Sequence, residues 1–190
     1  MEHVLVVALG NPGEKFKNTR HNLGQDIVLS WVELARERGA DVQVVQSKES
    51  LHARIQEVVF NNIKITILYP DVFMNESGKA VMQYLRYNEV DHKNILIVHD
   101  DLELPLSEVK LQESGSAKGH NGVRSIHEYL GTLEVPRLRI GIGRPADQKP
   151  IDVFVLEKFT EQERMIFDSK KQGVLDAITE AITAPGLIRR

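Results

Sequence analysis

The chain has 190 residues, of which 42% are hydrophobic and 27% charged, and its formal net charge is -3 at pH 7. This length and composition are typical of one globular domain and exclude a disordered or fibrous protein. The absence of cysteine excludes disulfides, thiolate metal sites and thiol nucleophiles and fits a reducing compartment, and the negative charge means that an RNA partner would need a local group of basic residues.

The chain opens with an apolar run over residues 4–9, which predicts a buried strand. The run is too short to cross a membrane and follows no basic segment, so we expect neither a membrane span nor a secretory signal. It breaks at Gly10-Asn11-Pro12-Gly13, and open α/β sheets hold ligands at the carboxyl ends of their strands. His21, on the same loop, is a candidate general base, although such a loop is also typical of an ordinary turn with a structural histidine.

The next elements are a helix and a hairpin. Apolar residues recur at helical spacing from Leu23 to Leu34, and Gly39 is expected to end this core-facing helix. Residues 51–60 and 63–69 are β-rich and flank an Asn-Asn pair that tolerates positive φ, so we expect a hairpin that ends at Pro70. A helix from about 79 to 87 follows.

The second half begins with a continuous apolar run from Asn94 to Asp100, typical of a strand buried on both faces. Its carboxyl end should lie beside that of the opening strand. Thr160 and Glu163 form a capping-box pattern for a long helix to about Ile182, with Pro185 beyond its end. We expect three further elements between these: a short strand near 109–111, a helix from about 119 to 130 and a strand over 137–142.

Strands alternate with helices along the chain, and one hairpin interrupts the parallel pattern. We therefore expect a single domain over residues 1–190, with three α/β/α layers on a mixed, mostly parallel central sheet. No internal repeat, low-complexity tract or linker indicates a second domain.

Two common catalytic motifs are absent. Residues 95–101 resemble the strand that ends in aspartate and holds magnesium in phosphate-loop nucleotide hydrolases, but the matching Gly-x-x-x-x-Gly-Lys-Ser/Thr loop is missing. The Gly-x-Ser-x-Gly elbow of serine hydrolases is also missing. A metal hydrolase stays an alternative, although its histidines lack the spacing of a helical metal motif. Its ligands would come from His21, His99, Asp100, Asp101 and His120.

A group of neutral amides, one imidazole and one carboxylate remains at loop positions: Asn11, His21, Asn75, Asp100 and Asn121. Hydrolysis of an acyl ester needs a base for water, a carboxylate to orient that base, and neutral donors for the developing oxyanion. These residues can fill those roles, although asparagines also brace loops and Asp100 could cap a turn. Their joint occurrence on separate loops favours ester hydrolysis.

Ordered motifs along nearly the whole chain resemble the bacterial-type peptidyl-tRNA hydrolase family. They are Gly10–Gly13, Thr19–Asn22, Phe73–Lys79, His99–Leu102, Gly119–Gly122 and Arg137–Gly143. The resemblance implies a peptidyl-tRNA hydrolase-like, phosphorylase/hydrolase-like fold and hydrolysis of the ester between a peptide and the terminal ribose of tRNA, which recycles tRNA in translation. It also implies a cytoplasmic monomer without metal or organic cofactor, with peptidyl-tRNA as its partner and no membrane association.

The resemblance also implies roles for individual residues, wherever their positions match the motifs of the family. The resemblance implies that His21 activates water, that Asp100 orients His21, and that Asn75 and Asn121 hold the 3′ end and stabilise the oxyanion. Further substrate contacts are expected at Asn11, Phe16, Phe73, Met74, Lys118, Arg137 and Arg139. We also expect a basic patch for tRNA phosphates, made of Lys15, Lys17, Arg20, Lys118, Arg124, Arg137 and Arg139.

The chain departs from the family pattern at positions that bear on tRNA contact. Phe16 stands where a tyrosine is usual, Gln112 where a lysine is frequent, and residues 114–118 replace a glycine-rich segment. The form of that segment looks more like eukaryotic members, so a mitochondrial location is an alternative, although no Arg/Ser-rich presequence is visible.

A second class of function also stays open. A relative with the same fold acts as an RNA-splicing partner without hydrolysis, so a non-enzymatic RNA-binding module is the alternative function. The presence of His21, Asp100, Asn75 and Asn121 argues against it.

Overall fold

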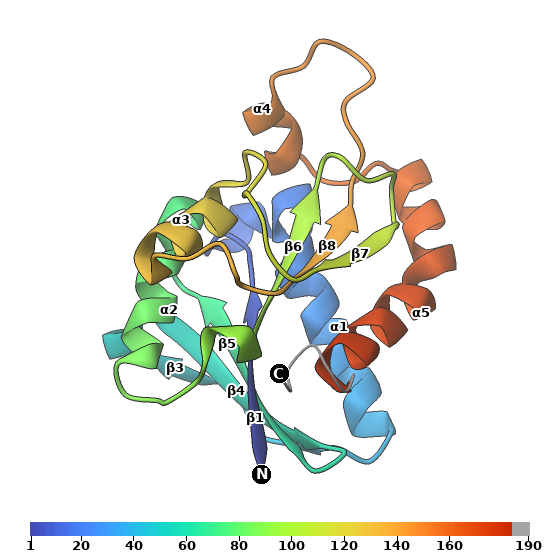
Figure 1. The fold of residues 1–190 in the computed structure, drawn as a ribbon. Coiled ribbons are helices and arrows are strands. Elements are labelled where there is room, and N and C mark those ends of the chain that lie inside the picture. Colours follow the sequence, from blue (N-terminus) through green and yellow to red (C-terminus); the bar gives the residue numbers. More distant parts are fainter. Residues whose placement is uncertain (184–190) are drawn as a thin grey trace.

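A mixed β-sheet forms the middle layer of the computed structural model, which describes residues 1–183 (Figure 1). Within these residues the strands are β1 (Glu2–Ala8), β2 (Asp41–Val42), β3 (Gln46–Lys48), β4 (Ala53–Phe60), β5 (Ile63–Pro70), β6 (Ile95–Asp101), β7 (Val109–Gln112) and β8 (Arg137–Gly141). Their order is β2-β4-β5-β1-β6-β8-β7, and β3 pairs with β4.

The centre of the sheet is parallel. Strand β1 pairs in parallel with β5 and β6, and β6 pairs in parallel with β8. Residues 4–9 and 95–98 are almost completely buried, as expected for strands covered on both faces. Ala8 lies opposite Val98, which confirms that the opening strand and the strand before Asp100 end side by side.

Helices cover both faces of the sheet, which confirms the three-layer α/β/α arrangement (Figure 1). On one face lie α1 (Leu23–Glu37), α4 (Ile151–Leu156) and α5 (Glu161–Thr183), and on the other lie α2 (Ser77–Leu85) and α3 (Asn121–Leu130). Short 3₁₀ helices connect the layers: η1 (Glu14–Phe16), η2 (Arg20–Asn22), η3 (Glu49–Leu51), η4 (Met74–Glu76) and η5 (His92–Asn94). None of the helices within residues 1–183 combines the length and apolar character needed to cross a membrane.

Several local predictions are confirmed. Asn61 and Asn62 have φ of 50° and 61° in the turn between antiparallel β4 and β5. Gly39 follows α1 with φ of 90°. Thr160 and Glu163 form a reciprocal capping box, in which Thr160 N donates to Glu163 Oε2 at 2.7 Å and Glu163 N donates to Thr160 Oγ1 at 3.2 Å. The predicted proline stop at 185 lies outside the described residues.

Other local features differ from the prediction. The strand expected from Leu51 begins at Ala53, because η3 ends in His52 with a left-handed φ of 52°. The helix expected at 79–87 spans Ser77–Leu85. Helix α4 and the short strands β2 and β3 have no counterpart in the sequence analysis. Helix α4 is too short to be stable from local propensity, and the burial of Phe154 and Val155 in the core holds it in place.

A close approach at Gly24 fixes the loop that precedes α1. A Cβ at this position would lie 2.3 Å from the carbonyl oxygen of Val98 and 2.8 Å from that of Leu9, so only glycine fits there. The first turn of α1 therefore sits directly on the carboxyl ends of β1 and β6. This contact carries η2, with His21, to the same edge of the sheet as Asp100.

Candidate active site

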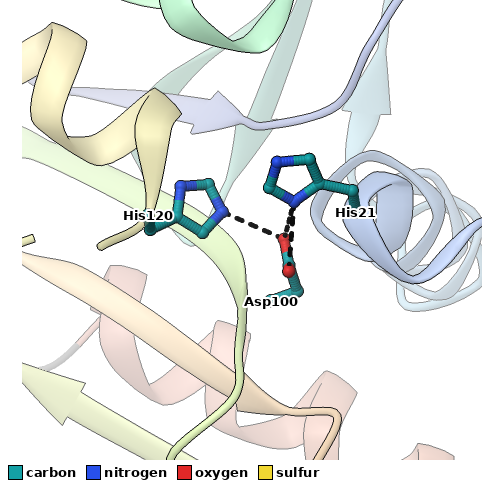
Figure 2. A group of neighbouring side chains, drawn as sticks. All are labelled: His21, Asp100 and His120. Atoms are coloured by element: carbon teal, nitrogen blue, oxygen red, sulfur yellow. Dashed lines mark hydrogen bonds and ion pairs between the residues drawn. The ribbon is translucent and has the colours of Figure 1, made fainter. Parts of the chain in front are cut away.

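Three side chains meet at the carboxyl end of β6: His21 from η2, Asp100 from β6 and His120 from the N-terminus of α3 (Figure 2). His21 Nδ1 lies 3.0 Å from Asp100 Oδ1 and 3.1 Å from Oδ2, and His120 Nε2 lies 3.0 Å from Oδ1. All three side chains are more than nine-tenths buried. The Asp100 carboxylate is thus shared by two imidazoles that come from opposite sides.

The hydrogen bonds define the protonation of both rings when they are neutral. The backbone N–H groups of Gly122 and Val123 donate to His120 Nδ1 at 3.2 and 3.3 Å, so this nitrogen carries no proton. The proton of His120 is therefore on Nε2, which donates to Asp100. His21 also donates to Asp100, through Nδ1, and its Nε2 lone pair is left to accept a proton and points away from Asp100 (Figure 2).

The pKa values follow from burial and from these contacts. Burial disfavours the charged form of His21, but the charge and hydrogen bond of Asp100 outweigh it and raise the pKa of His21 above 6.5. Burial also disfavours ionised Asp100, yet the two imidazoles hold its pKa well below the ordinary value of 3.8. At neutral pH Asp100 is therefore an anion that favours the imidazolium form of His21.

A third histidine, His99, lies behind this group. Its Nδ1 donates to the carbonyl oxygen of Asp100 at 2.6 Å, and its ring lies 4.7 Å from that of His120, centroid to centroid. Burial, followed by the proximity of His120, lowers the pKa of His99 to about 3. His99 is therefore neutral under physiological conditions and serves as a packing partner of His120.

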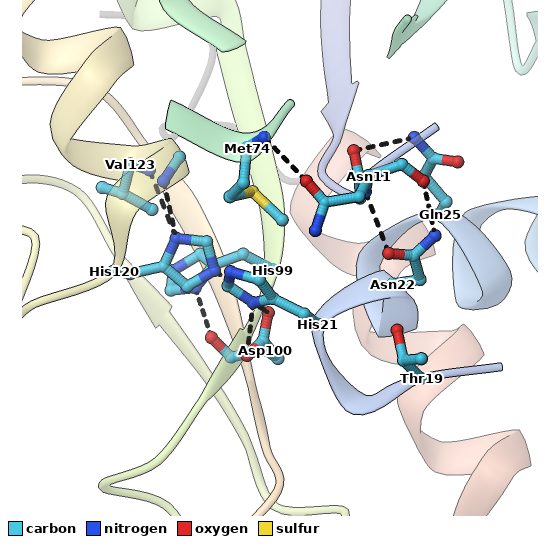
Figure 3. A network of polar contacts seen from close by, with 12 residues as sticks. Asn11, Thr19, His21, Asn22, Gln25, Met74, His99, Asp100, His120 and Val123 are labelled. Atoms are coloured by element: carbon cyan, nitrogen blue, oxygen red, sulfur yellow. Dashed lines mark hydrogen bonds and ion pairs between the residues drawn. The ribbon is translucent and has the colours of Figure 1, made fainter. Parts of the chain in front are cut away.

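Asn11 connects the opening loop to the neighbouring elements (Figure 3). Its backbone exchanges two hydrogen bonds of 2.9 Å with the side chain of Asn22, the residue after His21. Its Oδ1 accepts from the backbone N–H of Met74 at 2.8 Å, which orients the Asn11 amide beside η4. The Asn11 Nδ2 group makes no hydrogen bond to any residue that the structure describes.

The two other predicted asparagines, Asn121 and Asn75, have different surroundings. Asn121 begins α3, next to His120, and lines a cavity together with His21 and Asp100. Its Oδ1 accepts from Arg124 at 2.8 Å. Asn75 is exposed in η4, next to Met74, and the structure shows no contact between its side chain and the histidines. The structure thus brings Asn11, Asn121 and the histidine–aspartate group to one edge of the sheet, and Asn75 follows Met74, which contacts Asn11 there, with its own side chain exposed.

Hydrophobic side chains border this edge. Phe16 and Phe73 form an edge-to-face pair with ring centroids 6.3 Å apart, and Phe73 is 54% exposed. Met74 is buried, and its sulfur lies so close to Gly122 that a Cβ there would be 2.5 Å away. Met74 therefore supports the start of α3, while the two phenylalanines offer an apolar surface to a ligand.

A cavity of about 250 Å³ adjoins the shared carboxylate. Its lining includes His21, Asp100 and His120 together with Ile151, Asp152 and Val155 of α4. Helix α4 is thus a wall of the site, which the sequence analysis missed because it did not predict this helix.

The structure differs from the expected basic patch at three arginines. Arg20, Arg137 and Arg139 are each at most 3% exposed and do not lie on the surface. Arg139 Nε pairs with Asp101 Oδ2 at 2.6 Å, and Arg137 Nη2 donates to the carbonyl oxygen of Ser116 at 2.5 Å. Regular alternation along β8 turns both arginines toward the face that α3 covers, and the sequence alone could not show that this face is closed.

Arg20 has a structural role instead. Its Nη2 pairs with Glu163 Oε2 at 2.7 Å, its Nη1 donates to the carbonyl oxygen of Phe154 at 3.2 Å, and its guanidinium lies 4.1 Å from the Phe154 ring centroid. These contacts fasten α4 and the start of α5 to the residue immediately before His21. Of the predicted patch, Lys15, Lys17, Lys118 and Arg124 remain exposed.

The metal alternative can be tested against this geometry. His21, Asp100 and His120 are near enough for their ligand atoms to lie within 4.8 Å of one another. A metal would need an unprotonated Nε2 on His120, and the ring would then have to carry its proton on Nδ1. That proton would face the N–H groups of Gly122 and Val123, so binding would break the cap of α3. The donor set fits a hydrogen-bonded relay better than a metal site.

His120 was predicted only as a possible metal ligand, and Asn22 was not predicted as a site residue. The signal for His120 was its place before Asn121-Gly122 at a predicted helix start, where side-chain acceptors cap helices. The signal for Asn22 was its place beside His21, but nothing in a single sequence shows which loop its amide braces.

The family model and the similar sequences agree on one family. The family model described as "Peptidyl-tRNA hydrolase" matches residues 5–188. A peptidyl-tRNA hydrolase of Chloroflexus aggregans is 38% identical over 184 residues, 96% of this chain and 94% of that protein. A chloroplastic peptidyl-tRNA hydrolase of Arabidopsis thaliana is 41% identical over 92% of this chain and 58% of that protein.

The crystal structure of peptidyl-tRNA hydrolase from Acinetobacter baumannii superposes with a TM-score of 0.82 at 28% identity, covering 97% of this chain and 92% of that one. The fold and the sequence therefore point to the same relatives. Because the family model and these relatives span almost the entire chain, the protein belongs to the peptidyl-tRNA hydrolase family.

Proposed function

We propose that this protein hydrolyses the ester between a peptide and the 3′-terminal ribose of tRNA, with His21 as the general base. The observation that carries the proposal is the pair of hydrogen bonds from His21 Nδ1 to Asp100, which leaves Nε2 as the only basic atom of the ring. Family membership supplies the substrate class. Hydrolysis releases the free peptide and a tRNA that can be charged again.

The chemical steps follow from the position of the base. His21 Nε2 removes a proton from water while the water oxygen attacks the ester carbonyl carbon. The resulting imidazolium is stabilised by the Asp100 carboxylate, which stays ionised because its pKa is lowered. The tetrahedral intermediate then collapses, the bond from carbon to the ribose oxygen breaks, and His21 returns the proton to that oxygen.

The negative charge on the tetrahedral intermediate needs hydrogen-bond donors. The Asn121 amide, which lines the cavity beside His21 and Asp100, is one proposed donor. The Nδ2 group of Asn11 is held beside η4 by the contact of its Oδ1 to Met74 and is proposed to contact the peptide. Asn75, exposed in η4, is proposed to contact the 3′ end of the tRNA, with Phe16 and Phe73 offering apolar surface nearby.

The tRNA body requires positive charge at the surface. Lys118 is exposed and lines both the catalytic cavity and an open hollow on the side of α3, which Arg124 also lines. These two residues are the proposed phosphate contacts, because the arginines of β8 are buried. We further propose that the protein acts in the cytoplasm as a monomer, with the mitochondrion as the alternative location.

The deciding experiment measures release of the blocked amino acid from N-acetyl-aminoacyl-tRNA, with unblocked aminoacyl-tRNA as the comparison substrate. We expect rapid hydrolysis of the blocked form and little of the unblocked form. A matched control is His92→Ala, which changes a partly exposed histidine in η5, before the amino end of β6, whereas the site lies at the carboxyl end of that strand. Tight tRNA binding without any release by the purified protein would contradict the hydrolase and favour the RNA-binding alternative.

A further inference from the structure

The side chain of His120 makes three hydrogen bonds that link two parts of the molecule. Its Nδ1 accepts from the first turn of α3, at Gly122 and Val123, and thereby caps the helix. Its Nε2 donates to Asp100 Oδ1, on the neighbouring strand β6. A single ring thus connects the N-terminus of α3 to the carboxylate on which His21 depends (Figure 3).

The environment leaves His120 little freedom to turn. Its ring packs against those of His21 and His99, with centroids 4.8 and 4.7 Å away, and its side chain is 8% exposed. A flip of the ring would put a carbon atom in place of each nitrogen and would break the bonds to α3 and to Asp100 together. The same contacts therefore fix the orientation of the His120 ring, its tautomer and its hydrogen-bond partners.

The function proposed above gives this linkage a chemical consequence. We propose that His120 is a positioning residue for the hydrolytic reaction, which holds the Asp100 carboxylate in place for His21 and withdraws part of its negative charge. It touches neither the water nor the ester, and it acts only through Asp100. The rigid start of α3, on which Asn121 also lies, supplies the reference position.

By withdrawing charge from Asp100, the hydrogen bond from His120 affects the pKa of His21. Without the Nε2–H donor, Asp100 would attract the His21 imidazolium more strongly, and the pKa of His21 would rise further, so less of it would be the neutral base at pH 7. The other charged or titratable groups that face this cluster are His99 and Asp101 on β6, Arg137 and Arg139 on β8, Glu103 and Lys118 on the adjoining loops, and Asp152 on α4. None of them donates a hydrogen bond to the Asp100 carboxylate within the described residues.

Two substitutions separate the two roles of His120. In His120→Asn the side-chain oxygen can still cap α3, but the side chain is too short to reach Asp100. In His120→Gln the amide nitrogen can take the place of Nε2 and donate to Asp100, while the acceptor for Gly122 and Val123 is lost. His127→Gln is the matched control, since His127 is also buried on α3 but makes no contact with Asp100.

The first measurement is the pH profile of kcat/KM for N-acetyl-aminoacyl-tRNA. We expect His120→Asn to move the acidic limb upward by about half a pH unit or more and to reduce kcat by roughly 10-fold, with a Tm close to the unsubstituted protein. His120→Gln should keep the acidic limb in place and lower Tm by about 2 to 4 °C. His127→Gln should leave the limb unmoved. An unmoved limb and normal kcat in His120→Asn would overturn the proposal and leave His120 as a helix cap alone.

The second measurement needs no substrate. An NMR titration of the imidazole nitrogens should show His120 as the tautomer protonated at Nε2 and should give a higher pKa for His21 in His120→Asn than in the unsubstituted protein. A proton on Nδ1 of His120, or an unchanged pKa of His21, would overturn the proposal. Because the titration is independent of turnover, the inference and the proposed hydrolase activity can fail separately.

Discussion

Asp100 and Asp101 are neighbours at the end of the same strand, yet they have opposite surroundings. Asp100 lies on the side of Leu96 and Val98, and receives hydrogen bonds from two imidazoles, whereas Asp101 lies on the other side and pairs with Arg139. Burial is opposed by these partners in both cases, and both pKa values are lowered. Both carboxylates are therefore anions, but only one of them faces a group that can exchange a proton at neutral pH.

The difference shows that the partner decides what a buried carboxylate can do. An arginine stays charged throughout the physiological range, so Arg139 and Asp101 form a permanent ion pair that joins β6 to β8. An imidazole can gain and lose a proton, so the charge of Asp100 changes how strongly Nε2 of His21 holds a proton. The following predictions test this division between a structural and a chemical aspartate.

The largest effect is expected at His21. His21→Ala removes the general base and should lower kcat by roughly 100-fold or more, while the protein stays folded. The measurement is single-turnover hydrolysis of N-acetyl-aminoacyl-tRNA, with circular dichroism to check the fold. A folded variant with near-normal turnover would remove His21 from the mechanism.

The two aspartates should respond differently to the same change. Asp100→Asn should lower kcat by roughly 100-fold and change KM much less, because the amide cannot stabilise the imidazolium. Asp101→Asn should leave kcat nearly intact and reduce the free energy of unfolding by about 2 kcal/mol, because it weakens a charged hydrogen bond to a buried arginine. Urea titrations and steady-state kinetics on both variants would decide the matter, and equal losses of kcat would contradict the comparison.

The pH dependence of kcat/KM should show the effect of Asp100 on the pKa of His21. His21 must be neutral to act, so kcat/KM should fall as the pH drops through its pKa, which Asp100 raises above 6.5. In Asp100→Asn this influence is gone, and the residual activity should have its acidic limb at a lower pH. The same substitution at Asp101 should not move the limb. A flat profile between pH 5 and 8, the range in which histidine titrates, would exclude His21 as the base.

A smaller effect is expected for charge at the surface. Lys118→Ala should weaken tRNA binding several-fold and flatten the log-log salt slope by about one unit, with kcat at saturation largely unchanged. Arg139→Ala should instead destabilise the fold, because it leaves Asp101 buried without its partner. Filter-binding at several salt concentrations tests the first outcome. A salt slope that Lys118→Ala leaves unchanged would mean that this residue is not a phosphate contact.

The smallest effect is expected from chelation. If Asp100 and its two histidines held a catalytic cation, exhaustive treatment with a chelator would abolish turnover. We expect no loss, because the cap of α3 fixes the proton on the nitrogen that would have to bind the metal. Activity that disappears with chelator and returns with one divalent ion would require a different mechanism.

Much of the fold could be predicted from local sequence patterns. The buried strands, the Asn61-Asn62 turn and the capping box of α5 each depend on neighbouring residues, and the structure contains them. Helix α4 could not be predicted in the same way, because its stability comes from distant partners such as Arg20. Tertiary contacts rather than local propensity decide where such short elements form.

Prediction of the active site from the sequence is limited in the same way. Loop positions after strands identified His21 and Asp100 as residues that could meet, and they lie 3.0 Å apart. The sequence did not reveal which arginines are exposed, since that depends on the face that α3 covers. It also did not reveal the bond between His120 and Asp100, which arises because the N-terminus of α3 lies beside the carboxyl end of β6.

The order of the segments along the chain has a consequence during synthesis. His21 lies near the start of the chain, whereas its partner Asp100 follows 79 residues later and His120 a further 20. Proteins fold from the N-terminus as they leave the ribosome, and β6 can join the sheet only after that interval. The growing chain is itself a peptide esterified to tRNA, and it carries no assembled pair of His21 and Asp100 until more than half of its residues have been added.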